Sequence, residues 1–242
     1  MVNKNAFFKA LGFAAIATGI GIVFFGAKPQ ASDLDAFEKR GASERSVHKS
    51  IFSVYPERKI NFVMLGDSLT NFVNWNELLG RLDVANRGLT YQTSAGILEL
   101  AESVISLEPK LCFIMIGIND LRQGRSVEEV FENQRRLVTA LRQGGVEPVL
   151  QSVLFPGGDT AQVKKTASLV RSLNQKLQSY ASEEHLDYLD LNTVIAPQGV
   201  LPEPLSYDKL HLLGPGYALW AKVLNAYLES RGLAHEPTGS AA

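Results

Sequence analysis

Short runs of hydrophobic residues alternate with longer amphipathic stretches through most of the chain. Five runs have the length and composition of strands that are buried on both faces, namely residues 60–66, 82–88, 110–120, 146–155 and 186–192. Between and after them, residues 126–143, 160–180 and 214–232 repeat hydrophobic positions at the spacing of one helix face. This alternation predicts an α/β protein, a three-layer α/β/α sandwich around a five-stranded parallel sheet.

The first 27 residues depart from this pattern. Two lysines precede the uncharged stretch 10–27, a layout typical of a secretory signal peptide, and its 18 residues are also just enough to span a bilayer. An A-x-A cleavage site is lacking, because Phe25 and Pro29 stand where a small residue is needed. We therefore predict an uncleaved membrane anchor over residues 1–27, with a cleaved signal peptide as the alternative.

The charges around this segment indicate its orientation. Lysines lie on its amino-terminal side and Asp33, Asp35 and Glu38 follow it, which favours a cytoplasmic amino terminus. The rest of the chain is then expected outside the cytoplasm, in the periplasm or at the cell surface, tethered to the membrane or secreted if the segment is cleaved.

The remaining boundaries follow from composition. Residues 28–59 carry mixed charges without a sustained hydrophobic period, which predicts a linker with one short helix at most. Residues 60–232 are expected to form the folded domain, and residues 233–242 a flexible tail.

Charge and cysteine content exclude several functions. The chain has 24 Lys and Arg against 25 Asp and Glu, a formal net charge of −1, and so offers no basic surface for nucleic acid. Its single cysteine, Cys112, lies in a hydrophobic run and fits a small buried residue, with no disulfide framework or cysteine-based metal site. The oligomeric state is not indicated by the sequence.

Residues with useful chemistry follow the predicted strands. Ligands of a parallel sheet bind at the carboxyl ends of its strands. Ser68 follows the first strand, where its own amide would begin a helix, and Asn119 follows the third. Ser68 fits a nucleophile or only a helix cap, and Asn119 fits a donor to an oxyanion or another cap.

A serine hydroxyl needs a base to become a nucleophile. Of the four histidines, only His211 lies between the last predicted strand and the last predicted helix. Asp208 precedes it by three residues, a spacing that puts both side chains on one side of a helical turn, where the carboxylate would orient the imidazole. The alternative is a capping aspartate beside an incidental histidine.

Together these motifs resemble a known family. GDSLT at residues 66–70, GIND at 117–120 and DKLH at 208–211 are similar to three signature blocks of the SGNH, or GDSL, hydrolases, and the resemblance covers residues 60–228. The segments MIGIND, QSVL and GYALW look most like the branch of platelet-activating-factor-acetylhydrolase-like proteins and carbohydrate acetylesterases. The resemblance implies a flavodoxin-like fold and no metal or organic cofactor.

The resemblance also implies roles for individual residues. Ser68 would be the nucleophile, His211 the base, Asp208 its orienter, and Asn119 an oxyanion donor beside the Ser68 amide. One block departs from the family, whose usual pattern is N-R-G-I-S-G-D-T-T, because here the stretch is NRGLTYQTS. Tyr91 stands where the family has the second glycine, which donates its amide to the oxyanion.

Two residues are therefore candidates for that amide. Tyr91 keeps a backbone donor, but would be strained if the position needs a positive φ. Its ring would alternatively form a wall of the acyl pocket and restrict it to short acyl groups. Gly88, three residues earlier, is the other candidate.

The function that these features predict is a serine esterase that acts through an acyl-serine intermediate on short-chain esters, above all acetyl esters of small molecules or glycans. No long insertion that would form a lid interrupts the alternation of helices and strands. The alternatives are a lysophospholipase or thioesterase-type lipid hydrolase, a polysaccharide O-acyltransferase, and a non-catalytic, membrane-tethered binding domain. A metal-dependent hydrolase is disfavoured, since only one histidine lies near the acidic residues of the motifs.

Overall fold

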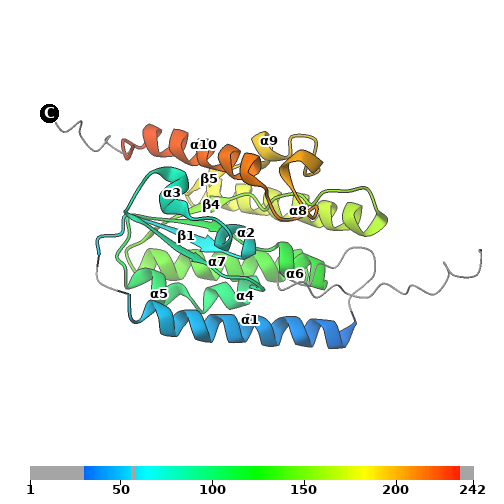
Figure 1. Ribbon diagram of the computed structural model, residues 1–242, viewed down its shortest axis with the longest axis horizontal. Helices are drawn as coiled ribbons and strands as arrows, with labels where there is room; N and C mark the ends of the chain where they lie inside the picture. The colour runs from blue at the N-terminus through cyan, green and yellow to red at the C-terminus, as the bar shows by residue number, and fades with distance from the viewer. Residues whose placement is uncertain (1–29, 56–57, 235–242) are drawn as a thin grey trace, which may run out of the picture.

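The computed structural model describes residues 30–55 and 58–234 (Figure 1). Within them, five parallel strands form one sheet in the order β2-β1-β3-β4-β5. The strands are β1 (Phe62–Gly66), β2 (Val84–Gly88), β3 (Leu111–Met115), β4 (Glu147–Gln151) and β5 (Asp187–Leu189). Each lies inside a predicted run, so the predicted fold class and all five strands are confirmed.

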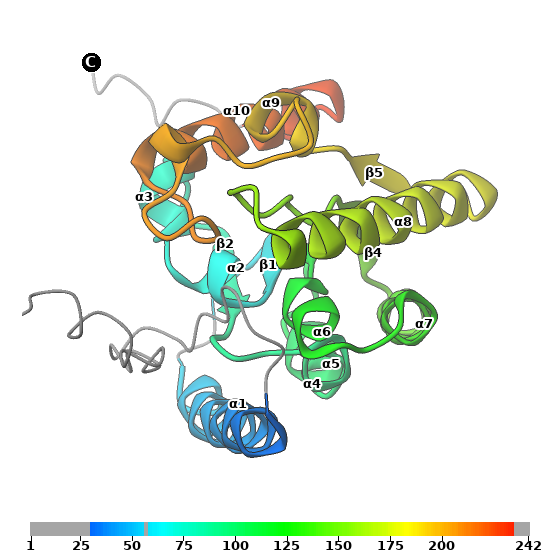
Figure 2. The ribbon, with the colours of Figure 1, turned by 90° about the vertical axis from the view of Figure 1, so that its right-hand side faces the viewer.

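Helices cover both faces of the sheet (Figure 2). On one side lie α3 (Trp75–Leu79) and α10 (Gly214–Ser230), and on the other α4 (Ser94–Leu98), α5 (Ala101–Ile105) and α7 (Val127–Gln143). Helix α8 (Ala161–Glu183) packs against α7 and β5. The shorter elements α2 (Ser68–Asn71), α6 (Ile118–Gln123), α9 (Asn192–Ile195) and the 3-10 helix η1 (Glu203–Leu205) lie in the connections.

The three predicted helices are α7, α8 and α10. Helix α7 begins where the Ser126 hydroxyl accepts a hydrogen bond from the Glu129 amide, and it buries an apolar face that includes Val130, Leu137 and Leu141. Helix α8 begins in the same way, at Thr160. A capping side chain and the helical spacing of hydrophobic residues, both readable in the local sequence, therefore predict α7 and α8.

The register of the sheet sets the position of the site. Gly66, the last residue of β1, pairs with Gly88 of β2 and with Met115 of β3. The carboxyl ends of three neighbouring strands thus reach the same level. The connection after β1 turns to the α3 face and the connection after β3 turns to the α7 face, the position at which ligands of open parallel sheets are ordinarily bound.

The segment before the sheet differs from the prediction. Instead of a linker with one short helix, α1 (Ala31–Phe52) is a 22-residue helix that lies alongside α4 (Figure 1). Helix α1 buries only Phe37 and Gly41, and much of its docking is polar, as in the ion pair of Glu38 with Arg125. With so little buried apolar surface, the helix has no hydrophobic period that would reveal it in the sequence.

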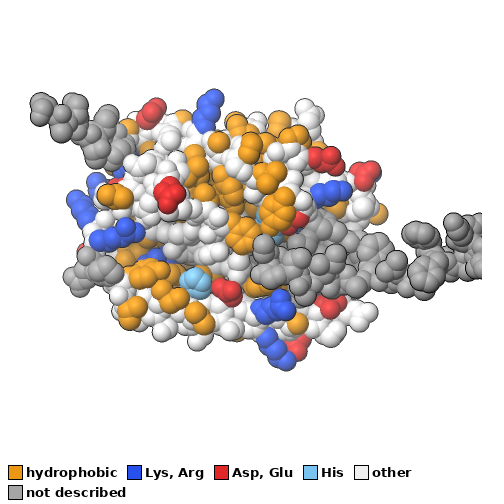
Figure 3. Space-filling view, in the orientation of Figure 1, with side chains coloured by type: hydrophobic (Ala, Val, Ile, Leu, Met, Phe, Trp, Pro, Cys, Tyr) orange, Lys and Arg blue, Asp and Glu red, His pale blue; other side chains and the backbone are white. Residues whose placement is uncertain are grey.

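The carboxyl-terminal end of α1 carries exposed hydrophobic side chains, which gather over this part of the surface in Figure 3. They are Val47 and Ile51, together with Val54 and Tyr55 just beyond the helix. The predicted anchor or signal segment, residues 1–27, lies outside the described residues, as does the tail beyond Ala234. Among the helices that are described, none combines the length and the hydropathy needed to cross a membrane.

Candidate active site

Ser68 is the first residue of α2, directly after β1. The cap of this helix is Asp67, whose Oδ1 accepts a hydrogen bond from the Leu69 amide at 3.0 Å, so Ser68 is not the cap. The turn is tight, because a Cβ on Gly66 would lie 2.3 Å from the Met115 carbonyl oxygen. Glycine therefore lets β1 end against β3 and present Ser68 at the carboxyl edge of the sheet.

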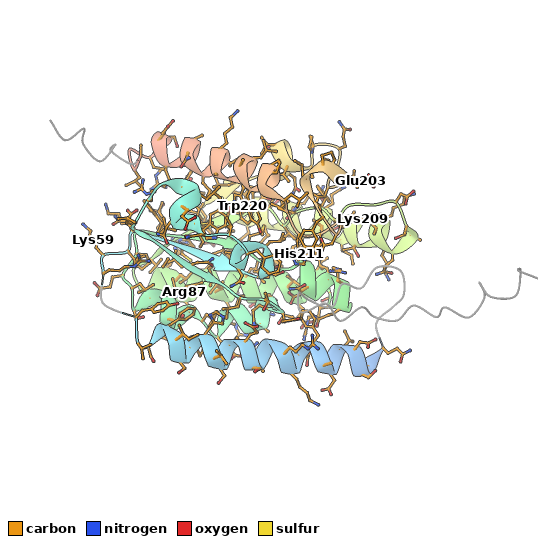
Figure 4. All side chains as sticks on the ribbon, in the orientation of Figure 1. Lys59, Arg87, Glu203, Lys209, His211 and Trp220 are labelled. Carbon is orange, nitrogen blue, oxygen red and sulfur yellow. The ribbon has the colours of Figure 1, made fainter. Side chains whose placement is uncertain are left out.

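Ser68, His211 and Asp208 form one hydrogen-bonded series. The Ser68 Oγ lies 2.8 Å from His211 Nε2, and His211 Nδ1 lies 2.6 Å from Asp208 Oδ2. Figure 4 shows His211 beside α2 at the carboxyl end of β1. The structure thus brings together three residues that the sequence separates by up to 143 positions.

The segment that carries Asp208 and His211 is a turn and not the helical turn that the spacing predicted. Ser206 and Leu212 form an antiparallel bridge across it, and Lys209 has a left-handed φ of 68° that a helix does not allow. Asp208 Oδ1 accepts the amide protons of Leu210 and His211, at 3.0 and 2.7 Å. The side chain of Asp208 therefore closes the turn and also orients the imidazole.

The environment of Asp208 favours its ionised form. Burial alone would raise its pKa, but hydrogen bonds from the His211 ring and from the backbone amides of His211 and Leu210 outweigh it and lower the pKa below its ordinary value. An ionised carboxylate at Nδ1 keeps the proton on that nitrogen. His211 Nε2 is then the acceptor that faces the Ser68 hydroxyl.

Two aromatic rings stack on the imidazole of His211. The Phe72 ring centroid lies 4.8 Å from it at an interplanar angle of 28°, and that of Tyr207 lies 5.9 Å away at 16°. Both rings are exposed, Phe72 by 37% and Tyr207 by 52%, whereas His211 is buried. Aromatic residues near strand ends more often pack in the core, whereas the ring of Phe72 is exposed beside His211.

The candidate oxyanion donor Asn119 follows β3 and lies in the first turn of α6. Its side chain is buried, and its Nδ2 donates a hydrogen bond to the Gln92 carbonyl oxygen at 2.8 Å. An amide nitrogen carries two protons, and this bond uses one of them. Because β3 is the neighbour of β1, Asn119 and Ser68 lie at the ends of adjacent strands.

The two candidates for the second backbone donor differ clearly. The Gly88 amide donates to Asn86 Oδ1 at 2.8 Å, and a Cβ on Gly88 would lie 2.4 Å from the Asn71 amide nitrogen. Gly88 thus uses its proton within β2 and, by lacking a side chain, lets α2 pack closely. These contacts disfavour Gly88 as an oxyanion donor.

Tyr91 has a φ of 56°, the left-handed conformation in which glycine is favoured. Tyr91 therefore has the positive φ at which a tyrosine is expected to be strained. Its ring packs edge-on against Phe37 of α1, with centroids 5.4 Å apart, and its hydroxyl accepts a hydrogen bond from Arg40. These contacts lie on α1 and give no support to the ring as a wall of the acyl pocket.

Comparison with known proteins identifies the family of the chain. Residues 64–219, more than half of the chain, match the GDSL-like lipase/acylhydrolase family. The chain belongs to this family. Membership implies hydrolysis of acyl esters.

Individual relatives of this family member are distant. A GDSL-like lipase from Bacteroides thetaiotaomicron superimposes with a TM-score of 0.69 at 20% identity, over 78% of this chain and 98% of that one. An acetyl-xylooligosaccharide esterase from Geobacillus Stearmophilus, solved as a mutant form, gives 0.59 at 19% identity, over 76% and 100%. Such likeness shows a shared fold.

A curated relative is longer than this GDSL-like chain. The N-acylneuraminate cytidylyltransferase of Streptococcus agalactiae serotype V is 26% identical over 194 residues, which are 79% of this chain and 42% of that protein. The chain thus spans about two fifths of the length of the curated relative it matches.

Each of the segments GDSL and GIND contains a buried carboxyl group, Asp67 in the first and Asp120 in the second. Asp120 accepts hydrogen bonds from the Ser94 amide and hydroxyl, and burial raises the pKa of Asp120 to about 6. Burial likewise raises the pKa of Asp67 to about 7, and its Oδ2 has no hydrogen-bond partner within the described residues. Across residues 30–55 and 58–234, no group of three or more His, Cys, Asp or Glu side chains is arranged to hold a metal ion.

Gln92 is a residue of the site that the sequence did not predict. Its side chain is fully buried, and its carbonyl oxygen holds the Asn119 amide. The only signal in the sequence is its place beside Tyr91, since a glutamine in a loop is ordinarily exposed.

Proposed function

We propose that the protein is a serine esterase that hydrolyses short-chain acyl esters, above all acetyl esters, through an acyl-serine intermediate. The observation that carries the proposal is the series Ser68 Oγ, His211 Nε2, His211 Nδ1 and Asp208 Oδ2, with separations of 2.8 and 2.6 Å. This is the geometry in which an imidazole takes the proton of a serine hydroxyl.

The reaction has two half-cycles. In the first, Ser68 Oγ attacks the ester carbonyl carbon while its proton passes to His211 Nε2, and the collapse of the tetrahedral intermediate returns that proton to the leaving alcohol. In the second, a water molecule gives its proton to His211 and attacks the acyl carbon, and Ser68 leaves with the proton. Asp208 stays ionised and stabilises the imidazolium in both.

The oxyanion of each tetrahedral intermediate needs hydrogen-bond donors. In the proposal these are the Asn119 side-chain amide and the backbone amides of Ser68 and Tyr91. Support comes from the bond of Asn119 to Gln92, which fixes the amide group, and from the left-handed φ of Tyr91, a conformation in which glycine is favoured.

The proposed preference for a short acyl group rests on the connections of the sheet and on a protein of similar fold. Within residues 58–234, the connections at the carboxyl edge of the sheet carry short helices and turns, and none contains an inserted element that would form a lid. A protein of similar fold is named as an acetyl-xylooligosaccharide esterase, which makes an acetylated glycan a reasonable first substrate class to test.

The deciding experiment is hydrolysis of p-nitrophenyl acetate, butyrate and decanoate by the full chain, with Ser68→Ala and an EDTA-treated sample beside it. We expect turnover of the acetate that is lost in Ser68→Ala, resists EDTA and falls steeply by decanoate. Decanoate turnover equal to that of acetate would instead favour a lipid hydrolase. No hydrolysis by folded protein would overturn the esterase, and acyl transfer to polysaccharide would then be assayed.

The site of action is part of the same proposal. We propose that residues 1–27 tether the domain outside the cytoplasm, which would give it access to extracellular glycan esters. Protease treatment of intact spheroplasts tests this placement, and protection of the domain from the protease would contradict it.

A further inference from the structure

Helix α1 contacts the turn after β2 through three successive helical turns. The Phe37 ring packs edge-on against Tyr91, the Gly41 carbonyl oxygen accepts a hydrogen bond from Gln92 Nε2 at 2.9 Å, and Arg45 Nη1 donates to Gln92 Oε1 at 2.9 Å. These residues are spaced by four positions and so lie along one face of α1.

The approach of α1 to this turn depends on a glycine. A Cβ on Gly41 would lie 2.6 Å from the Tyr91 carbonyl oxygen, closer than such atoms can come without a shift. A glycine inside a helix weakens the helix relative to alanine. Gly41 is therefore a helix-weakening residue at the point where the helix meets the backbone of Tyr91.

Gln92 connects this helix to Asn119. Both ends of its side-chain amide bind α1, and its backbone carbonyl oxygen accepts the hydrogen bond from Asn119 Nδ2 at 2.8 Å. Arg45 is itself fixed by two hydrogen bonds to the Glu99 carboxylate, each of 3.2 Å. A continuous series of contacts thus runs from α1 through Gln92 to the Asn119 side chain.

Helix α1 lies outside residues 64–219, the part of the chain that matches the family. We propose that α1 is a positioning element of the active site, in which Gly41 and Arg45 hold Gln92 and thereby set Asn119 and the left-handed Tyr91 in place for the oxyanion. This inference rests on the proposed esterase function. The contacts of α1 with Tyr91 and Gln92 lie in the turn after β2, and the ion pair of Glu38 with Arg125 joins α1 to the segment after α6.

A left-handed Tyr91 needs external support. A non-glycine residue in this region is strained and persists only where its surroundings hold it. The ring contact with Phe37 and the two bonds of Gln92 to α1 are such supports. Loosening α1 is expected to free the turn after β2 and to misplace the oxyanion donors Asn119 and Tyr91. Ser68, His211 and Asp208 should keep their contacts.

The experiment uses the full chain with two variants of the contact and two controls. Gly41→Ala adds the methyl group that meets the Tyr91 carbonyl, and Arg45→Met removes the donor to Gln92 at similar volume. Ser43→Ala alters the exposed face of α1, and Lys49→Met removes a cation that pairs with Glu99 at 3.9 Å without touching Gln92. Active sites are counted by fluorophosphonate titration, so that kcat refers to correctly folded enzyme.

We expect Gly41→Ala and Arg45→Met to lower kcat per titrated site about tenfold with little change in KM, since a misplaced donor weakens only the transition state. Ser43→Ala and Lys49→Met should keep the parent kcat. Normal kcat in both contact variants of an active enzyme would overturn the positioning role.

A double-mutant cycle separates positioning from general destabilisation. Asn119→Ala alone should lower kcat about 100- to 1000-fold. If Gly41 acts through Asn119 as well as Tyr91, adding Gly41→Ala to that variant should cost less than the roughly tenfold loss that it causes in the parent chain, whereas fully multiplied losses would overturn the route through Asn119. Failure of the parent chain to hydrolyse any ester would instead defeat the proposed function.

Discussion

The Asp208 carboxylate holds His211 at two points. Its Oδ2 accepts a hydrogen bond from ring Nδ1 at 2.6 Å, and its Oδ1 accepts the backbone amide of the same residue at 2.7 Å. One side chain therefore determines both the path of the backbone through this turn and the orientation of the imidazole.

Asp208→Asn should separate these two roles. An asparagine oxygen can still accept the amides of Leu210 and His211, so the turn and the melting temperature should be preserved. Its NH₂ group would donate to Nδ1 and move the ring proton to Nε2, which then no longer accepts the Ser68 proton. We expect kcat to fall on the order of 10³- to 10⁴-fold. Asp208→Ala should lose the turn as well, and retained activity in Asp208→Asn would contradict the assigned tautomer.

Gly88→Ala should destabilise the protein and inactivate it together. The added Cβ would meet backbone atoms of Thr70 and Asn71 at 2.6 and 2.4 Å, so α2 and the serine at its start must move. We expect a loss of about 1 to 3 kcal/mol in the free energy of unfolding, measured by urea denaturation, with a parallel loss of kcat. Gly214→Ala is the matched control, since its Cβ meets no atom within 4 Å.

Removal of either ring beside His211 should reduce catalysis. The Phe72 and Tyr207 rings stack on the imidazole, so Phe72→Ala and Tyr207→Ala should each lower kcat/KM about tenfold by releasing its orientation. Tyr207→Phe keeps the ring and should retain the parent rate. Steady-state kinetics with p-nitrophenyl acetate measures both, and equal losses in Tyr207→Phe and Tyr207→Ala would show that the hydroxyl matters and the stacking does not.

The buried carboxyl of Asp67 should make stability depend on pH. Burial raises its pKa from 3.8 to about 7, so between these values the folded state holds a proton that the unfolded state has released. Stability from this group is therefore greatest at low pH and falls as the pH rises toward 7.

Asp67→Asn removes this titration and keeps an oxygen for the Leu69 amide. Between pH 5 and 8, the free energy of unfolding of the parent chain should fall relative to the variant by on the order of 2 kcal/mol. Chemical denaturation across this range measures the difference, and parallel pH profiles for the two proteins would show that Asp67 does not titrate there.

The sequence predicts the sheet well because local signals and packing agree. Every strand lies in a predicted run, three of them end at Gly66, Gly88 and Gln151, and the order of parallel strands brings Gly66 and Met115 side by side. Because β1 and β3 are neighbours, Ser68 and Asn119, which follow these strands, lie at adjacent strand ends. The spacing of three residues predicts the pairing of Asp208 with His211 through a helical turn, whereas the structure forms this pair in a turn with Lys209 in the left-handed region.

Helix α1 and the role of Gln92 could not be predicted from the sequence, for a physical reason. Helix α1 docks through a buried glycine, one buried aromatic ring and polar contacts such as that of Arg45 with Gln92. The spacing of hydrophobic residues in the sequence therefore does not predict this helix. The role of Gln92 depends on partners 47, 51 and 27 residues away, Arg45, Gly41 and Asn119. Contacts at such separations exist only after the tertiary fold is formed.

The separation of 143 positions between Ser68 and His211 affects when the site can form during protein synthesis. Ser68 leaves the ribosome 143 residues before His211, which lies in the turn that precedes α10. In the proposed mechanism, a chain that ends before residue 208 therefore carries Ser68 without its base and is expected to be inactive. If the proposed mechanism holds, esterase activity is expected only after this last turn has docked beside α2, so it would report that folding is complete.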